Sequence, residues 1–456
     1  MPGSIELRKM RVLAVGLART GVATALFCAR HNATVTATDI RPESELGDTP
    51  AKLREAGVKL ELGGHQEQTY LAQDLIIPSP GVSADDPLLA KARSKGITVW
   101  SEIELAYRFM EGEMIGITGS NGKTTTTTLV HHVLKTAGRK AILAGNVGTP
   151  LISRVEAMNS ETVTVVELSS FQLELTDKFR PDIAVFLNLT PDHLDRHKDM
   201  ETYAAAKARI FAKQTEMDAA VLNADDAPTV VLAPKRPQVF WFSRKENVER
   251  GACLRGEDIV VRHHKKEEFV MKSSEIPLAG THNVENVLAA VTAARLAEVD
   301  AASIREGVRS FAGVEHRLEF VAEINGVRYY NDSKATNVDA TLKALNAFSG
   351  GILIILGGKD KGSDYTVLQK PLREKATLAL LIGAAAGKIH RQIAGSVAIE
   401  RAETLERAVE IASQTAHAGD VVLLAPACAS FDQFENFEQR GRVFKELVKG
   451  LVGSKS

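Results

Sequence analysis

The sequence predicts an α/β protein of three domains, each built around a mostly parallel sheet. The first observation is length, because 456 residues are too many for one ordinary core. The second is that short apolar runs of strand length alternate with segments of helical periodicity. The third is that Gly, Pro and polar residues follow many of these runs. We expect domains over residues 1–101, 102–313 and 314–456.

The first domain begins with two strands and a helix. RVLAVG is the first apolar run, ARTGVATALFCARHN has helical periodicity, and TVTATD is a second strand that ends at Asp39. This order predicts a Rossmann-like unit. Its turn carries Gly16 and Gly21, but Ala18 replaces the middle glycine of the dinucleotide pattern G-x-G-x-x-G. Two interpretations stay open: one nucleotide bound at the helix N-terminus, or a plain α/β turn.

The central domain opens with the segment GITGSNGKTTTTT at residues 116–128. A strand, EMIGIT, precedes the SNGK turn, and a helix follows it. The usual phosphate loop, G-x-x-x-x-G-K-[ST], requires a glycine where this chain has Ile117. The Gly-Lys-Thr turn at the helix N-terminus is nevertheless intact, and unpaired N–H groups there favour phosphate. The sequence therefore predicts a central domain of the P-loop ATPase type.

Three further residues of this domain are candidates for chemistry. Glu167 ends the strand TVTVVEL, where it is either a Mg²⁺ ligand facing the loop or a solvated strand end. His193 follows a Pro-Asp turn in NLTPDHLD, which is typical of an ordinary polar turn residue. Lys207, in TYAAAKARIFA, has the local pattern of a solvent-facing helix lysine. Polar groups at strand ends lie where parallel sheets bind ligands.

The third domain repeats the alternation. Its strands are expected in GVRYYND, GGILIILGG, LALLIG and DVVLLAP, and a helix in NVDATLKALNAF. This order predicts a second Rossmann-like, doubly wound sheet.

Composition excludes several classes of protein. The formal net charge is −1, so bulk charge does not attract nucleic acid or an anionic membrane. Cys28, Cys253 and Cys428 are far apart and form no zinc or disulfide pattern. No run approaches the ~20 apolar residues of a membrane span, and the N-terminus lacks a signal-peptide pattern. We expect a cytoplasmic monomer that binds no nucleic acid and does not insert into a membrane.

Taken together, the motifs resemble the ATP-dependent Mur ligases of peptidoglycan synthesis. They are TGSNGKTT, ELSSFQLE, NLTPDHLDRH, YAAAKARI, GTHNVENVLAA, VEHRLEF, NDSKATN and PACASFDQFENFEQRG, and they cover essentially the whole chain in order. The family has the shorter loop TGxNGK[ST], which accounts for Ile117. NDSKATN and ACASFDQFENFEQRG favour the member that adds D-glutamate over members that add other amino acids and over folylpolyglutamate synthases.

The resemblance implies a ligase that forms an amide in two steps. ATP phosphorylates the carboxylate of UDP-N-acetylmuramoyl-L-alanine, and the amine of D-glutamate then displaces phosphate from the acyl phosphate. The three domains would bind the UDP substrate, ATP and the incoming amino acid, in that order. One alternative is another Mur-type or folylpolyglutamate-type ligase. The other is a nucleotide-binding regulatory protein without chemistry, against which the complete candidate set argues.

The resemblance also implies a role for each site residue. Lys123, Glu167, His193 and Lys207 are the catalytic group, and two Mg²⁺ ions are held by Thr124 and Glu167 and by His193 and a carbamylated Lys207. ATP is contacted by Gly119, Ser120, Asn121, Gly122, Lys123, Thr124, Thr125, Asn283, Asn286, Arg317, Asp332 and Lys334. Asn146 and Ser169 meet the muramoyl-alanine part, and Arg19, Thr20, Asp39, Arg41, Ser79 and Gly81 form the uridine pocket. D-Glutamate is bound by Thr336, Lys361, Ser430 and Phe437, with Lys359 as the alternative to Lys361.

Overall fold

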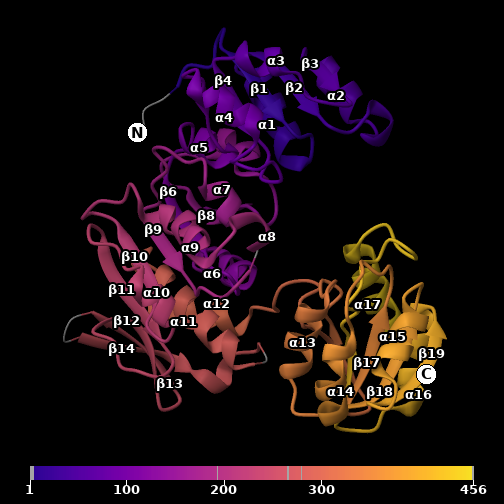
Figure 1. Ribbon diagram of the computed structural model, residues 1–456. Coiled ribbons are helices and arrows are strands. Elements are labelled where there is room, and N and C mark those ends of the chain that lie inside the picture. Colours follow the sequence, from indigo (N-terminus) through magenta and orange to yellow (C-terminus); the bar gives the residue numbers. More distant parts are fainter. Residues whose placement is uncertain (1–4, 193, 264–265, 279, 454–456) are drawn as a thin grey trace. The chain divides into compact units, whose positions relative to one another are not determined.

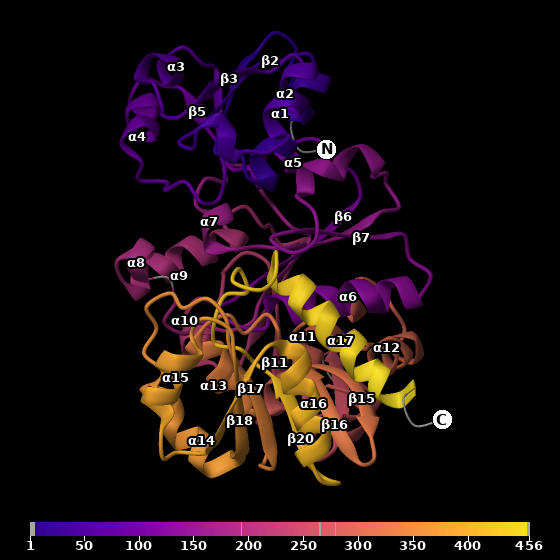
Figure 2. The same ribbon diagram turned by 90° about the vertical axis from the view of Figure 1, so that its right-hand side faces the viewer.

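The computed structural model describes residues 5–192, 194–263, 266–278 and 280–453. The chain forms two compact units, Met1–Ile276 with Val284–Arg309, and Pro277–Asn283 with Ser310–Ser456. The described residues of the two units form three sheets (Figures 1 and 2). Among the described helices, none is both long enough and apolar enough to cross a membrane.

The N-terminal sheet is entirely parallel, with the order β3-β2-β1-β4-β5. Its strands are β1 (Arg11–Val15), β2 (Thr34–Asp39), β3 (Lys59–Leu62), β4 (Leu75–Pro78) and β5 (Thr98–Val99). Its helices are α1 (Arg19–Arg30), α2 (Thr49–Glu55), α3 (Glu67–Leu71), α4 (Pro87–Ser94) and α5 (Glu102–Tyr107). The Rossmann-like start predicted from the sequence is confirmed.

The central sheet has nine strands in the order β14-β13-β12-β11-β10-β9-β6-β8-β7. The parallel strands are β6 (Glu113–Thr118), β7 (Ala141–Gly145), β8 (Val163–Glu167), β9 (Ile183–Phe186), β10 (Ala219–Asn223), β11 (Gln238–Ser243) and β12 (Arg250–Arg255). Two antiparallel strands follow, β13 (Asp258–His263) and β14 (Lys266–Lys272). This antiparallel edge is not among the strands predicted from the sequence.

The helices of this sheet begin with α6 (Lys123–Thr136), which follows the predicted loop directly. The others are α7 (Ser170–Leu173), α8 (Leu194–His197), α9 (Met200–Ala208), α10 (Ala227–Val231), α11 (Thr281–Leu296) and α12 (Ala301–Arg309). β6 lies between β8 and β9, so the residues at the carboxyl ends of these three strands are neighbours.

The second unit contains a six-stranded sheet in the order β15-β16-β20-β17-β18-β19, parallel except for the β15–β16 pair. The strands are β15 (Glu319–Ile324), β16 (Val327–Asn331), β17 (Ile352–Gly357), β18 (Ala376–Ile382), β19 (Ala398–Glu403) and β20 (Val421–Leu424). The helices are α13 (Val338–Asn346), α14 (Gln369–Lys375), α15 (Ala386–Ile393), α16 (Leu405–Thr415) and α17 (Phe437–Gly453).

Helices cover both faces of this sheet, which explains why its strands read as continuous apolar runs. On β17, Ile352, Ile354 and Leu356 pack with residues of α13, α14 and α15, whereas Leu353 and Ile355 pack with residues of α16 and α17. Alternate side chains of a strand point to opposite faces, so a strand buried on both sides carries apolar residues throughout. The predicted doubly wound sheet is confirmed (Figure 1).

Glu104, on α5, ties this helix to the segment that follows α7 in the first unit. The side chain is fully buried, and its oxygens accept hydrogen bonds from the backbone N–H groups of Asp177, Lys178 and Phe179 and from Arg108 Nε at 2.7 Å. Removing a buried charge leaves its partners unsatisfied.

We therefore expect Glu104→Ala to lower the free energy of unfolding by about 3 kcal/mol. Exposed Glu111, on the same segment of chain, is the matched control, and Glu111→Ala should change the free energy by less than about 0.5 kcal/mol. Equilibrium unfolding in urea measures both. Equal effects of the two substitutions would show that the buried contacts of Glu104 do not stabilise the unit.

Candidate active site

The segment Gly119–Gly122 forms a tight turn between β6 and α6, and the predicted phosphate loop, residues 119–125, continues into the first turn of this helix. Gly119 and Gly122 have φ values of +151° and +82°, and an added Cβ would lie 2.9 Å from Leu187 Cβ at Gly119 and 2.2 Å from Asn286 Oδ1 at Gly122. Only glycine fits at these two positions. The first turn of α6, with buried Thr124 and Thr125, starts where the loop ends. Its N–H groups and helix dipole make this terminus suitable for phosphate.

The rest of the loop is held by the segment that follows β9. Ser120 N donates to Asn188 O at 2.9 Å, and Ser120 Oγ donates to Thr190 O at 2.9 Å. Asn121 N donates to Asn188 Oδ1 at 2.8 Å. The loop conformation is therefore built into the protein before any ligand arrives.

Two lysines converge on one carbonyl of this loop. Lys123 Nζ donates to Gly119 O at 2.9 Å and to Ser120 O at 2.8 Å, and Lys207 Nζ donates to Gly119 O at 2.7 Å. Lys207 is only 1 % exposed. Burial, reinforced by the nearby charge of Lys123, lowers the pKa of Lys207 to about 7. The local sequence pattern predicts that Lys207 faces solvent. This prediction is wrong, because α9 packs Lys207 against the loop.

Glu167 has one carboxylate oxygen engaged and one buried without a hydrogen bond. Oε1 accepts from Asn146 Nδ2 at 2.7 Å, while no described residue donates a hydrogen bond to Oε2. The side chain is 2 % exposed, so it is not a solvated strand end. A buried, unsatisfied carboxylate oxygen is costly unless a cation completes it, and Mg²⁺ prefers such oxygens. The unsatisfied Oε2 of Glu167 therefore has the chemistry of a magnesium ligand.

The structure gives contacts for some of the other candidate residues of this site but not for all of them. Asn286, on α11, is buried, and its Oδ1 accepts a hydrogen bond from Thr126 Oγ1 at 3.3 Å, so it lies beside the loop. Asn283 is one turn earlier on the same helix. Ser169 is the N-cap of α7 and forms a capping box with Gln172. His193 lies outside the described residues. No cluster of three or more His, Cys, Asp or Glu side chains suited to a metal occurs among the residues described.

Of the residues predicted to form the uridine pocket, some are held by hydrogen bonds and others are partly or fully exposed to solvent. Asp39, at the end of β2, accepts a hydrogen bond from Leu17 N at 2.6 Å and two from the Arg41 guanidinium, at 3.0 and 2.8 Å. These bonds, above all those from Arg41, hold the pKa of Asp39 at about 2. Ser79 Oγ donates to Gly16 O at 2.6 Å. Thr20 is half-buried, whereas Arg19 and Gly81 are exposed.

In the second unit, Asp332 follows β16 and is buried close to two cations. Burial raises the pKa of its carboxyl to about 6, against the opposing charges of Arg317 and Lys334. Arg317 Nε is buried and has no hydrogen-bond acceptor among the described residues. Three predicted ATP contacts thus lie together in this unit. Lys334 Nζ also lies 5.9 Å from the centroid of the Phe437 ring.

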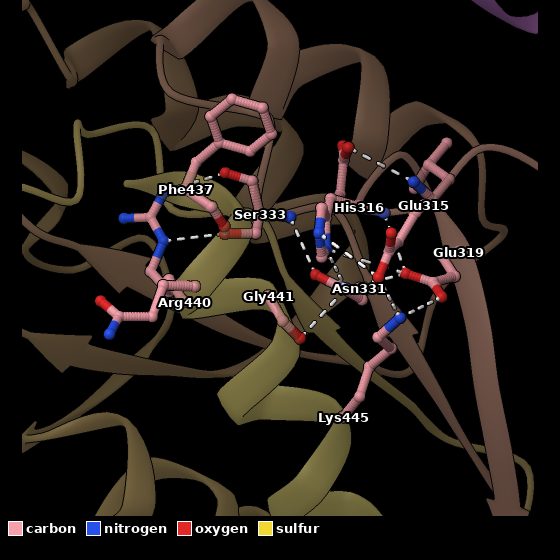
Figure 3. Close-up of polar contacts among 12 residues, drawn as sticks. Glu315, His316, Glu319, Asn331, Ser333, Phe437, Arg440, Gly441 and Lys445 are labelled. Carbon is pink, nitrogen blue, oxygen red and sulfur yellow. Dashed lines mark hydrogen bonds and ion pairs between the residues drawn. The ribbon is translucent and has the colours of Figure 1, made fainter. Parts of the chain in front are cut away.

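Arg440, which the sequence analysis did not select, joins three segments that carry candidate residues. Its Nε donates to Ser333 Oγ at 3.0 Å, its Nη2 donates to Ser333 O at 2.9 Å, and its guanidinium also donates to Cys428 O at 3.3 Å. Ser333 Oγ in turn donates to Phe437 O at 2.8 Å (Figure 3). The arginine is fully buried, which lowers its pKa to about 10. The motif ENFEQRG contains it, but sequence alone does not indicate burial.

A second group, also shown in Figure 3, fixes the strand end before Asp332. His316 and Asn331 are buried, and the two side chains meet at 3.0 Å between Nδ1 and Nδ2. Glu319 accepts from Asn331 Nδ2 at 2.9 Å and from Lys445 Nζ at 2.9 Å. A Cβ on Gly441 would lie 2.2 Å from His316 Nδ1, so α17 can approach only because this residue is glycine.

The residues predicted to bind D-glutamate lie on three segments of the second unit. Thr336 follows the Asp332–Lys334 turn, Ser430 is buried in the segment after β20, and Phe437 begins α17. Lys361 and its alternative Lys359 are both exposed on the turn after β17. Lys359 N donates to Ala429 O at 2.8 Å, which ties this turn to the Ser430 segment.

Three models of Mur ligase domains match this chain. The Mur ligase MurD-like N-terminal domain matches residues 10–101, the Mur ligase middle domain matches 117–294, and the Mur ligase glutamate ligase domain matches 316–428. The chain is also 53 % identical over 449 residues to a UDP-N-acetylmuramoylalanine--D-glutamate ligase of Koribacter versatilis, covering 98 % of this chain and 99 % of that protein. The chain belongs to the Mur ligase family. The ligase of the same name from Acidobacterium capsulatum is 52 % identical over 99 % of this chain and 98 % of its own length.

Solved structures of Mur ligases share the fold. The UDP-N-acetylmuramate-alanine ligase MurC of Thermotoga maritima aligns with a TM-score of 0.59 at 19 % identity, covering 97 % of this chain and 100 % of that one. The MurF ligase of Thermotoga maritima, solved in complex with ADP, aligns with a TM-score of 0.58 at 17 % identity, covering 99 % and 98 %. The three-domain α/β fold predicted from the sequence is therefore that of a Mur ligase. The domain boundaries at residues 101 and 313 stay predictions.

Proposed function

We propose that this Mur ligase joins D-glutamate to UDP-N-acetylmuramoyl-L-alanine with ATP, through an acyl phosphate. The observation that supports the proposal most strongly is full-length identity above 50 % to relatives that carry the name of this ligase. The reaction supplies a precursor of peptidoglycan, and with it the wall that sets cell shape and allows division. We place the enzyme in the cytoplasm and propose that it acts as a monomer.

The phosphate loop supports the first step. A carboxylate attacks the γ-phosphorus of ATP poorly, because both reactants are negative, so positive charge must gather where they meet. Gly119–Thr125 would hold the triphosphate through backbone N–H groups, with Lys123 as its cation. Asn286, beside Gly122, would contact the same nucleotide. Asn283, Arg317, Asp332 and Lys334 are the other residues that we propose as ATP contacts.

Two Mg²⁺ ions would neutralise phosphate charge when bound. Thr124 and Glu167 would hold one ion, in agreement with the unsatisfied Oε2 of Glu167. His193 and Lys207 would serve the other. A lysine can do so only if its ammonium charge is removed, and its neutral amine can add CO₂ to form a carbamate and release a proton. The lowered pKa of Lys207 increases the fraction of that neutral amine.

The remaining residues would bind the two substrates that become joined. Asn146 and Ser169 would meet the muramoyl-alanine part, and Arg19, Thr20, Asp39, Arg41, Ser79 and Gly81 the uridine nucleotide. Thr336, Lys361, Ser430 and Phe437 would bind D-glutamate so that its amine faces the acyl phosphate. Lys361 would meet a carboxylate as a point charge.

Strict choice of amino acid tests this function. With ATP, Mg²⁺ and UDP-N-acetylmuramoyl-L-alanine, D-glutamate should stimulate ADP release at least about 100-fold more than L-glutamate, because inverting the stereocentre turns the amine away from the acyl phosphate. A panel with L-alanine, a diamino acid and D-alanyl-D-alanine tests the other Mur activities in the same assay. Equal rates with both glutamates, or a preference for another amino acid, would contradict the proposal.

A further inference from the structure

The turn after β17 is fixed by Asp360, which lies between the two candidate lysines Lys359 and Lys361. Asp360 Oδ2 accepts from Lys388 Nζ, on α15, at 2.8 Å. Asp360 Oδ1 accepts from Tyr365 OH at 2.8 Å and from Ser363 N at 3.1 Å. Two donors from the segment just after the turn and one donor from α15 thus hold one carboxylate, and the bond from Lys388 contributes most to lowering the pKa of Asp360.

Tyr365 extends this network to the segment that carries Ser430. It is fully buried, and its hydroxyl oxygen lies 3.0 Å from Cys428 Sγ. An ionised carboxylate can only accept, so the single phenolic proton belongs to the bond with Asp360, and the thiol of Cys428 donates to the phenolic oxygen. Burial raises the pKa of Cys428 to about 11, which keeps that thiol protonated.

The backbone connects the same two segments a second time. Lys359 N donates to Ala429 O at 2.8 Å, and Gly357 N donates to Pro426 O at 2.9 Å. Gly358 has a φ of +134°, and a Cβ there would lie 2.2 Å from Ala429 O. The turn of Lys359–Lys361 therefore lies against the Cys428–Ser430 segment, with Asp360 pulled toward Tyr365 and Lys388.

We infer that Asp360, through Lys388 and Tyr365, is a positioning residue for D-glutamate. It holds the Lys359–Lys361 turn and the Ser430 segment in one geometry, and Lys388 balances a negative charge that would otherwise repel the carboxylates of the amino acid. The inference rests on the proposed function, since it assigns these two segments to D-glutamate. A chain of hydrogen bonds thus connects the Cys428 thiol, the Tyr365 hydroxyl and the Asp360 carboxylate, and Lys388 neutralises the charge of this carboxylate.

The test measures KM for each of the three substrates and kcat in the full-length enzyme. For Lys388→Met and for Asp360→Asn we expect the KM for D-glutamate to rise about tenfold or more, because a charged hydrogen bond is lost. The KM values for ATP and for UDP-N-acetylmuramoyl-L-alanine, and kcat, should stay within about threefold of wild type. Tyr365→Phe keeps the buried ring and should raise the KM for D-glutamate by about threefold.

A double substitution shows whether Asp360 and Lys388 act on D-glutamate binding as a pair or whether each substitution perturbs the protein independently. In Asp360→Asn with Lys388→Met, the rise in KM for D-glutamate should be smaller than the product of the two single effects, because both remove the same pair. Lys343→Met is the matched control: Lys343 Nζ also pairs with an aspartate, Asp339 Oδ2, at 2.6 Å in the same unit, and its loss should leave all KM values unchanged.

Each result decides between the proposals. If wild type releases no ADP in response to D-glutamate, the proposed function is overturned and the inference with it. If wild type is active and the KM for D-glutamate stays within about twofold in both single variants, only the inference is overturned. A parallel rise in all three KM values, or multiplicative effects in the double variant, also overturns it.

Discussion

Lys123→Ala is expected to lower kcat by a factor of about 100 or more while the fold survives. The ammonium of Lys123 lies at the turn between β6 and α6, within hydrogen-bond distance of Gly119 O and Ser120 O. In the proposed reaction it stabilises charge that develops on the transferred phosphoryl group, and this stabilisation is needed most in the transition state. Its removal should therefore affect the chemical step more than substrate binding.

The measurement is ADP release at saturating concentrations of all substrates, with thermal unfolding to verify the fold. Lys135→Ala is the control, because Lys135 is exposed in the last turn of the same helix, and it should keep the activity of wild type. A kcat of Lys123→Ala within about threefold of wild type would mean that this loop is not the phosphate site.

Replacing Lys207 is expected to abolish formation of the acyl phosphate, whether the substitute is alanine or arginine. An ammonium beside Mg²⁺ and Lys123 adds repulsion to a site that must gather cations around phosphate, whereas a carbamate supplies an anionic oxygen ligand. Arginine keeps the charge but forms no carbamate, so we expect Lys207→Arg to be no better than Lys207→Ala. Nucleotide binding should be affected less than turnover.

A ¹³C NMR signal tests directly whether Lys207 carries a carbamate. Wild type prepared with ¹³C-bicarbonate should show a carbamate resonance that Lys207→Ala lacks. Lys213→Ala, an exposed lysine six residues further along the chain, should retain both the resonance and the activity. Fully active wild type without the resonance, or a Lys207→Arg variant as active as wild type, would exclude the carbamate.

Sequence patterns alone predict the main parallel strands of the fold and a candidate phosphate loop. The apolar runs RVLAVG, EMIGIT and ILIILG read as buried strands because covered parallel strands need apolar residues on both faces, and they form β1, β6 and β17. Gly122 and Lys123 are predicted to belong to a phosphate loop because a local turn before a helix favours an anion at that position. The antiparallel strands β13 and β14 could not be predicted from the sequence, because their charged residues give no strong alternation of apolar and polar positions.

The environments on which the proposed chemistry depends arise from long-range packing, which local sequence does not reveal. Lys207 stands among alanines on a short helix, and its burial arises because α9 packs beside a loop about ninety residues away in sequence. Arg440 and Asp360 likewise have partners on distant segments, so no local pattern distinguishes them from surface charges. Periodicity reports which face of an element is buried. Which polar groups meet there, and hence how strongly each is held or its pKa shifted, depends on long-range packing.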